Sequence, residues 1–209
     1  MKNGYFFNRL IRLVKRQACR VYLVVVLAAW EFSEFADEEK LYLLASPQPL
    51  QDVASLILET GMRPTEIYNL TRQQVNLEKG FVQIENGKTK SSNRKVWLSD
   101  VTSKVLQFRL KNFKGKYVFP KGEKDGAGAT YQLNEQHRET LNRIGLKFRL
   151  YDCRHTFATR VLDSGIDLLT LASMLGHSSL AEVIKYAHPS ETRKNDVIKQ
   201  MQKKVAKAV

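Results

Sequence analysis

Three side chains in the last third of the sequence have the chemistry needed to bind and attack a phosphate. Arg154 is a guanidinium, His177 an imidazole and Tyr186 a phenol, and each borders an otherwise apolar segment. A guanidinium makes paired hydrogen bonds to phosphate oxygens, and a phenol can serve as a nucleophile. Taken singly, they have ordinary structural interpretations: a solvated arginine, a loop histidine and a packing tyrosine. Evidence that they form a phosphate site therefore has to come from their order and spacing.

Two short helices are predicted to position two of these side chains, His177 and Tyr186. Each has apolar residues at i, i+3, i+4 and i+7, which predicts one buried face per helix. The first set is Leu168, Leu171, Ala172 and Leu175, and the second is Leu180, Val183, Ile184 and Ala187. Gly176 follows the first helix where a left-handed cap is expected, so His177 is placed just beyond the helix end. At about 100° per residue, Tyr186 is expected at the flank of the second face.

The stretch from Tyr151 to Tyr186 resembles the C-terminal half of the catalytic domain of the tyrosine recombinases, the phage integrase family. The family pattern is H-x-x-R-H-T, then L-G-H, then a tyrosine. The segments R-H-T at 154–156 and L-G-H at 175–177, together with Tyr186, match it in order and spacing. Tyr151 departs from the pattern, because it stands where the family most often has histidine.

An earlier segment supplies a second arginine. Residues 60–67 read T-G-M-R-P-T-E-I, with Pro64 suited to the first position of a helix and Arg63 directly before it. Backbone N–H groups and a guanidinium then meet at a helix N-terminus, which favours an anion. Alternatively, Arg63 is a surface arginine in a loop. The segment also resembles the first arginine motif of the family, where Glu66 is expected to support an active-site group.

Residues 80–98 predict a β-hairpin, because apolar residues alternate with polar ones on both sides of the turn E-N-G-K-T-K-S-S-N. A basic hairpin tip could simply be a solubilising loop. In the family, however, a lysine on this hairpin reaches the scissile phosphate. Lys88 is the expected equivalent, and Lys90 is the alternative.

The resemblance implies a reaction in which DNA is cut without a metal or another cofactor. Arg63 and Arg154 would clamp the non-bridging oxygens, and His177 would add a hydrogen bond. Tyr186 would attack the phosphorus to form a 3′-phosphotyrosine, and Lys88 would protonate the leaving 5′ oxygen. Nearby cations are expected to ease ionisation of the phenol.

Two further side chains are given roles by the same comparison. Tyr151 would offer its hydroxyl to the phosphate, in place of the usual imidazole. His155 is expected to be structural, packing beneath the site.

Composition favours a nucleic-acid partner. The chain has 209 residues, a formal net charge of +13 and a pI near 9.8, so an anionic partner is expected, DNA first and a membrane surface next. Cys19 and Cys153 are too few for a disulfide framework or a zinc site, and Cys153 is interpreted as a small apolar core residue. We expect a reduced, cytoplasmic protein encoded by a bacterium, a phage or a mobile element.

The predicted fold class is mainly α with a small antiparallel sheet, and the resemblance implies the tyrosine-recombinase catalytic fold. Helices are expected from residue 37 to the prolines that follow it, and over 50–59, 100–111, 131–144 and 191–209. Residues 36–209 would form the catalytic domain with a C-terminal tail helix. Residues 1–35 form a short basic and apolar segment, a remnant or replacement of a DNA-binding domain.

The apolar run at 21–30 within the N-terminal segment is too short for a bilayer span, which needs about 20 residues. A buried helix or strand is favoured there over a membrane role.

Three functional hypotheses follow. The first is a site-specific recombinase or integrase that assembles as a homo-oligomer on double-stranded DNA through its tail. The second is a topoisomerase IB-like enzyme that nicks and reseals one strand by the same chemistry. The third is a truncated remnant that binds DNA without productive cleavage, because a shortened N-terminus removes phosphate contacts.

Overall fold

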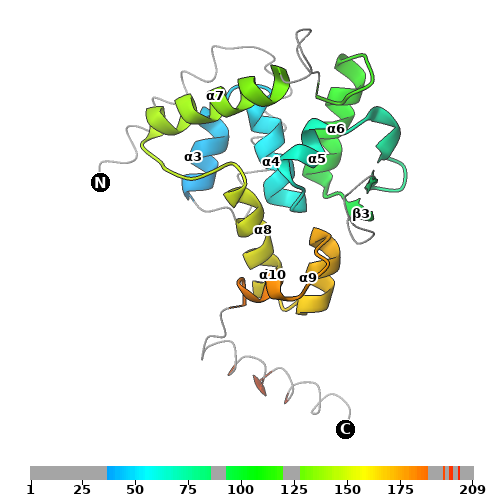
Figure 1. Cartoon of the computed structure of the whole chain (residues 1–209), viewed down its shortest axis with the longest axis vertical. Coiled ribbons are helices and arrows are strands. Elements are labelled where there is room, and N and C mark those ends of the chain that lie inside the picture. The colour runs from blue at the N-terminus through cyan, green and yellow to red at the C-terminus, as the bar shows by residue number, and fades with distance from the viewer. Residues whose placement is uncertain are drawn as a thin grey trace.

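Two groups of helices make up the part of the chain described by this computed structural model, and the second group begins with the helix that packs against the first (Figure 1). It describes residues 37–85, 93–119 and 128–187, and residues 195, 198, 199 and 202 of the tail. The first group comprises α3 (Asp37–Ala45), α4 (Leu50–Thr60), α5 (Pro64–Tyr68), α6 (Asp100–Asn112) and α7 (Gly128–Ile144). The second comprises α8 (Asp152–Asp163), α9 (Leu168–Leu175) and α10 (Ala181–Ile184).

These elements confirm the predicted fold class, mainly helical with a small antiparallel sheet. The predictions for the N-terminal segment 1–35, for Lys88 and Lys90, and for all but four positions of the tail helix lie outside the described residues.

The sheet contains the predicted hairpin and one further strand. β2 (Phe81–Ile84) pairs with β3 (Arg94–Trp97) in antiparallel register, so that Ile84 lies opposite Arg94. A two-residue strand, β1 (Val75–Asn76), follows the 3-10 turn η1 (Arg72–Gln74) and pairs with the other edge of β2. We did not predict β1, because two residues are too few to show an alternating pattern.

Helix ends are formed by the residues expected to form them. α4 ends at Gly61, whose φ of 66° is left-handed and whose N–H donates to the Ile57 carbonyl at 2.9 Å. α9 ends in the same way at Gly176, with a φ of 68°. At its start, the Asp167 carboxylate accepts from the N–H groups of Leu169 and Thr170, both at 2.9 Å.

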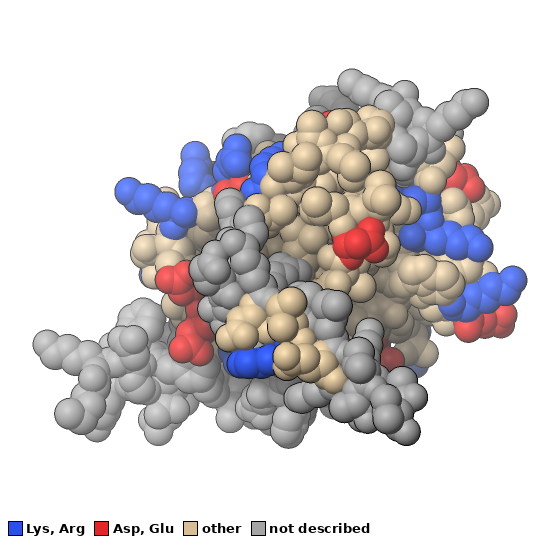
Figure 2. All heavy atoms as spheres, turned by 90° about the horizontal axis from the view of Figure 1, so that it is seen from below, with Lys and Arg blue, Asp and Glu red and all other residues tan. Residues whose placement is uncertain are grey.

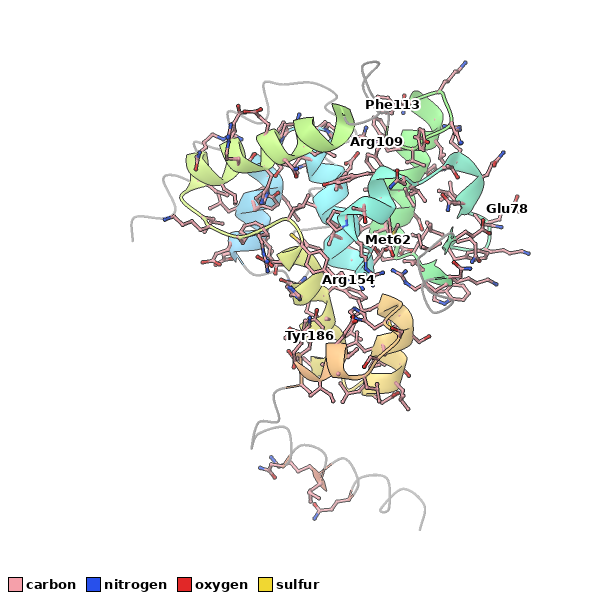
Figure 3. All side chains as sticks on the ribbon, viewed as in Figure 1. Met62, Glu78, Arg109, Phe113, Arg154 and Tyr186 are labelled. Atoms are coloured by element: carbon pink, nitrogen blue, oxygen red, sulfur yellow. The ribbon has the colours of Figure 1, made fainter. Side chains whose placement is uncertain are left out.

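Two hydrophobic clusters correspond to the two groups of helices. The larger is built on α4, which packs against α3, α5, α6, α7 and α8. Val82, Ile84 and Val96 of the sheet and Cys153 of α8 also belong to it. The smaller unites α8, α9 and α10. It consists of Phe157, Ala158, Leu162, Leu171, Ala172, Leu175, Val183 and Tyr186. Arg154, with no exposed surface, lies where the two groups meet (Figure 3).

The predicted buried face of α10 was right for Val183 and wrong for Leu180 and Ile184. Leu180 and Ile184 are 40% and 56% exposed, whereas Val183 and Tyr186 are buried. The cause is the local hydrogen bonding, because the N–H of Tyr186 donates to the carbonyl of Val183 and that of Ala187 to Ile184. Such i to i+3 bonds give three residues per turn, so residues three apart share a face. Tyr186 therefore points inward with Val183.

Candidate active site

Arg154 is held at the C-terminal ends of two helices. Its guanidinium donates to the Gly61 carbonyl at 2.5 Å and to the Leu175 carbonyl at 2.6 Å, at the ends of α4 and α9. Helix C-termini carry partial negative charge and unpaired carbonyls, so a cation is stabilised there. Burial and the charge of Arg63 lower the pKa of Arg154 to about 10, which leaves it cationic at neutral pH. Its Nε is buried without a hydrogen-bond partner among the described residues.

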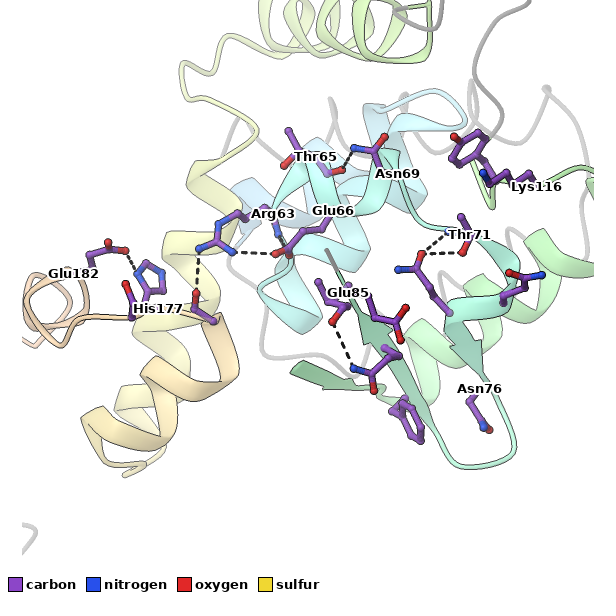
Figure 4. A pocket seen from close by; sticks show the side chains of 18 residues that line it. Arg63, Thr65, Glu66, Asn69, Thr71, Asn76, Glu85, Lys116, His177 and Glu182 are labelled. Carbon is purple, nitrogen blue, oxygen red and sulfur yellow. Dashed lines mark hydrogen bonds and ion pairs between the residues drawn. The ribbon is translucent and has the colours of Figure 1, made fainter. Parts of the chain in front are cut away.

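Arg63 approaches the same place from the first group of helices. It precedes α5, and its guanidinium donates to Glu66 at 2.9 Å and to the Gly176 carbonyl at 3.4 Å (Figure 4). The side chain of Arg63 is 29% exposed. It is therefore partly free for a ligand in the cleft beside it.

Glu66 connects α5, on which it lies, with β3 and, through Arg94, with α9. Besides Arg63, its carboxylate accepts two hydrogen bonds of 2.9 Å from Arg94 of β3. Arg94 in turn donates to the Met174 carbonyl of α9 at 2.8 Å. This is the geometry expected of a residue that supports Arg63. Although burial raises the pKa of Glu66, the hydrogen bonds and charges of Arg94 and Arg63 outweigh it, and the net pKa is lowered.

Glu66→Gln is expected to destabilise the fold at pH 7 by about 1–3 kcal/mol, because it removes a carboxylate that accepts charged hydrogen bonds. A depressed carboxyl pKa contributes stability above the ordinary value of 4.5 and loses it as pH falls through the folded value. The difference between variant and wild type should therefore shrink below pH 4.5, as measured by urea unfolding.

Glu135→Gln is the control for this titration, because Glu135 forms an exposed pair with Arg138. It should change stability by less than about 1 kcal/mol at any pH. A Glu66→Gln difference that is constant or grows on acidification would contradict the account of Glu66.

His177 follows Gly176, as predicted, and its side chain is only 4% exposed. Its Nε2 lies 2.9 Å from a nitrogen of Arg154, and its Nδ1 contacts the Glu182 carboxylate. Because arginine can only donate, Nε2 is the acceptor and Nδ1 carries the proton donated to Glu182. Burial and Arg154 lower the pKa of His177 against the opposing effect of Glu182. The imidazole is therefore neutral at pH 7 in this DNA-free state.

Glu182→Ala is expected to disturb this tautomer. Without the carboxylate, the pKa of His177 should fall further, since Glu182 is the charge that raises it, and the Nδ1–H form should lose its preference. Nitrogen-15 NMR of the imidazole across a pH series measures both effects. Glu85→Ala, which removes another carboxylate lining the same cleft, is the control. An unchanged His177 spectrum in Glu182→Ala would refute the assigned tautomer.

Tyr186 is 7% exposed and lies in the smaller hydrophobic cluster. Its hydroxyl is 2.6 Å from Nδ1 of His155. Burial raises the pKa of Tyr186, and the charges of Arg154 and Arg63 lower it by less. The expectation that nearby cations ease ionisation is thus correct in direction, but desolvation outweighs them in this state.

The ring of Tyr151 packs edge-on against the ring of His155, with centroids 5.2 Å apart. Tyr151 directly precedes α8 and is partly buried.

Cys153, two residues further on, is buried, and burial raises the pKa of its thiol to about 12. Cys153 is therefore the apolar core residue that we predicted.

An open cleft of about 1200 Å³ extends from this site to the sheet. Arg63, Gly176, His177 and Glu182 line one end of it (Figure 4). Amide and hydroxyl side chains in and around α5, η1 and the strands line much of the rest: Thr65, Asn69, Thr71, Gln73, Gln74, Asn76 and Gln83. Phe81, Ile84, Glu85, Lys116 and Tyr117 line it as well. These groups can donate and accept hydrogen bonds, which suits a polar ligand.

The described Lys and Arg side chains stand mainly at the two sides of the face seen from below, with a smaller basic patch near its lower middle, and acidic residues lie among them (Figure 2). Within the described ranges, no helix has the length and hydropathy of a membrane span. No group of three or more His, Cys, Asp or Glu side chains is placed there to share a metal ion.

The structure thus joins most of the predicted site residues. Hydrogen bonds link Arg154 to His177, while Arg63 donates to the Gly176 carbonyl next to His177. Tyr186 and Tyr151 meet at His155.

Sequence reasoning missed the contacts of three other residues: Arg94, His155 and Glu182. Arg94 could have been found from the alternation in β3, which puts it on the buried side with Val96. The contact of His155 with Tyr186 depends on the i to i+3 turn that carries Tyr186, which no sequence pattern predicted. Glu182 contacts His177 from the first turn of α10.

Comparison with known proteins identifies the family of this mainly helical domain with its three-stranded antiparallel sheet. The chain belongs to the phage integrase family, whose profile matches residues 34–193. It is 31% identical over 163 residues to the integrase of Salmonella phage P22, covering 72% of this chain and 42% of that protein. It is 29% identical over 177 residues to the tyrosine recombinase XerD of Halalkalibacterium halodurans, covering 77% and 58%. The chain therefore spans about half the length of these relatives.

Solved structures agree with the fold. The catalytic domain of bacteriophage HP1 integrase superposes with a TM-score of 0.60 at 25% identity, covering 79% of this chain and 92% of that one. The Tn1549 transposon integrase in complex with circular intermediate DNA superposes with a TM-score of 0.67 at 16% identity, covering 96% and 94%.

Proposed function

We propose that this chain carries the catalytic centre of a site-specific DNA recombinase or integrase, which breaks and rejoins strands through a 3′-phosphotyrosine. The observation that best supports the proposal is the convergence of Arg63, Arg154 and His177 near a buried tyrosine. Burial raises the pKa of the Tyr186 phenol, and the positive charges of Arg154 and Arg63 act in the opposite direction. Two cations and a phenol meet the requirements for in-line attack on a phosphodiester.

Binding of the scissile phosphate rearranges the hydrogen bonds of the resting site. Arg154 gives up His177 as an acceptor and donates to the phosphate, as does the partly exposed Arg63. His177 then gains a proton on Nε2, with Glu182 stabilising the imidazolium from Nδ1, and becomes a donor to the same phosphate. Tyr151 adds its hydroxyl. Each of these bonds strengthens as negative charge develops on the oxygens in the transition state.

Tyr186 attacks the phosphorus, and the bond from phosphorus to the deoxyribose 5′ oxygen breaks. Lys88, or Lys90, donates a proton to the leaving oxygen. Because the phosphotyrosine keeps the energy of the broken bond, a 5′-hydroxyl of another strand can reverse the attack without a high-energy cofactor.

Double-stranded DNA is the proposed partner. The formal net charge of +13 favours it, and an integrase of the same fold has been solved with DNA. We further propose that protomers assemble on DNA through the segment after Tyr186, and that the protein acts in the cytoplasm of a bacterial host.

A covalent-trapping assay tests the proposal. Nicked suicide substrates, prepared from DNA on both sides of the gene, lose the cleaved fragment and so trap a protein–DNA adduct on a denaturing gel. Wild type should give an adduct, and Tyr186→Phe should give none while binding the same DNA. Binding without any wild-type adduct would favour the non-cleaving remnant. Adducts that reseal only their own strand would favour topoisomerase-like activity.

A further inference from the structure

The imidazole of His155 lies within hydrogen-bond distance of the hydroxyl of Tyr186. The two side chains are 2.6 Å apart, from His155 Nδ1 to the phenol oxygen, and their ring centroids are 5.3 Å apart. On the other side of the imidazole, Nε2 lies 3.8 Å from Oδ1 of Asp152. Asp152 and His155 are three residues apart on α8, so they share one helix face. The imidazole of His155 thus lies between the carboxylate of Asp152 and the hydroxyl of Tyr186.

We propose that His155 is a catalytic residue of this chain, the general base that removes the phenol proton of Tyr186 during attack, with Asp152 as its positioning residue. The proposal rests on the proposed function and adds a residue to it. The step balances as follows: the Tyr186 oxygen bonds to phosphorus, its proton passes to Nδ1 of His155, and the 5′ oxygen leaves with a proton from the lysine. His155 becomes an imidazolium, which the Asp152 carboxylate stabilises.

The resting charges suit this role. Asp152 raises the pKa of His155, but burial and the charges of Lys185, Arg149 and Arg154 lower it, with a net decrease. The imidazole is therefore unprotonated at neutral pH and able to accept a proton. Asp152 faces Nε2, so it favours the tautomer with the proton on Nε2 and leaves Nδ1 free for the phenol. Although burial raises the pKa of Asp152, hydrogen bonds from Arg149 outweigh it, and the carboxyl stays ionised.

A base is needed here because burial raises the pKa of Tyr186, so the phenol does not ionise unaided at neutral pH. Within the described ranges, His155 is the side chain that lies within hydrogen-bond distance of the Tyr186 hydroxyl.

The test compares rates of adduct formation on the suicide substrate for wild type, His155→Ala and a matched control. His137→Ala is the control, because His137 also lies 2.6 Å from a tyrosine hydroxyl, that of Tyr42 in the larger cluster. At pH 7 we expect His155→Ala to lose about 10²- to 10⁴-fold in rate, the range for a general base. His137→Ala should keep the wild-type rate and pH profile.

Rescue separates a base from a packing residue. Replacing Tyr186 with a difluorotyrosine lowers the phenol pKa, so an ionised nucleophile no longer needs a base. The rate of His155→Ala should then recover most of its loss at pH 8–9, and its pH profile should rise with ionisation of the phenol. A loss that neither fluorination nor high pH relieves would overturn the proposal, as would a wild-type pH profile in His155→Ala.

A DNA-free measurement keeps this inference distinct from the proposed function. Nitrogen-15 NMR of wild type at pH 7 should show His155 neutral, with Nε2 protonated and Nδ1 bare. A proton on Nδ1, or an imidazolium, would refute the proposal even if adducts form. Absence of any wild-type adduct, with the expected tautomer present, would instead refute the proposed function.

Discussion

Arg154→Ala should reduce adduct formation by about 10²- to 10³-fold or more, the loss expected when one donor to developing negative charge is removed. Arg154 is fully buried and reaches Gly61, Leu175 and His177, so no neighbouring side chain can take its place. The rate of adduct formation on the suicide substrate, at saturating protein, measures this effect.

The same substitution should also destabilise the fold. Two carbonyls at helix ends would lose their buried donor, at about 1–3 kcal/mol each. Arg154→Lys keeps the charge but not the fork of donors, so it should restore part of the stability and little of the rate. Arg149→Ala, which breaks an exposed pair with Asp152, is the surface control for stability. An Arg154→Ala protein that is folded and cleaves at the wild-type rate would contradict the assignment.

Gly61→Ala should be more destabilising than the same change at Gly80, Gly115, Gly145 or Gly165, where an added Cβ would meet no atom within 4 Å. A Cβ at Gly61 would lie 2.3 Å from a ring carbon of Phe157 and 2.9 Å from a methyl of Leu175, and the φ of 66° is itself unfavourable for alanine. We expect a loss of about 2–5 kcal/mol, from about 1–2 for the left-handed backbone and 1–3 for overpacking. Chemical denaturation followed by circular dichroism measures it.

Gly145→Ala is the matched control for this prediction. Gly145 follows α7 with a φ of 75°, and no atom lies within 4 Å of a Cβ placed there. It should therefore lose only the backbone contribution of about 1–2 kcal/mol. Equal losses of stability in the two variants would contradict the prediction, because they would show that close packing of Phe157 and Leu175 does not constrain Gly61.

The ends and faces of most helices were predictable because they follow from local rules. Pro64 begins α5, and Gly176 ends α9 in a left-handed cap, as their positions indicated. The same rules predicted Arg63 and His177 at helix ends, where the structure places them. The two-residue strand β1 was too short for any periodic signal.

The orientation of Tyr186 could not be predicted, because it depends on a choice between two turn types. A helix of 3.6 residues per turn puts the phenol at a flank, whereas the i to i+3 bonding after Leu180 turns it into the cluster with Val183. Tertiary packing decides between them, and with it the contact with His155. Likewise, the partner of Glu66 on β3 is 28 positions away in sequence, at Arg94, and only the folded sheet brings the two together.

The most direct test of the account is to identify the residue joined to DNA in the trapped adduct. Protease digestion of the adduct, followed by nuclease treatment and tandem mass spectrometry, locates the remaining nucleotide on one peptide. We predict a nucleotide linked through its 3′-phosphate to the oxygen of Tyr186, with a free 5′-hydroxyl on the released strand. A nucleotide on any other residue, Tyr151 included, or cleaved DNA carrying no protein, would contradict the central claim.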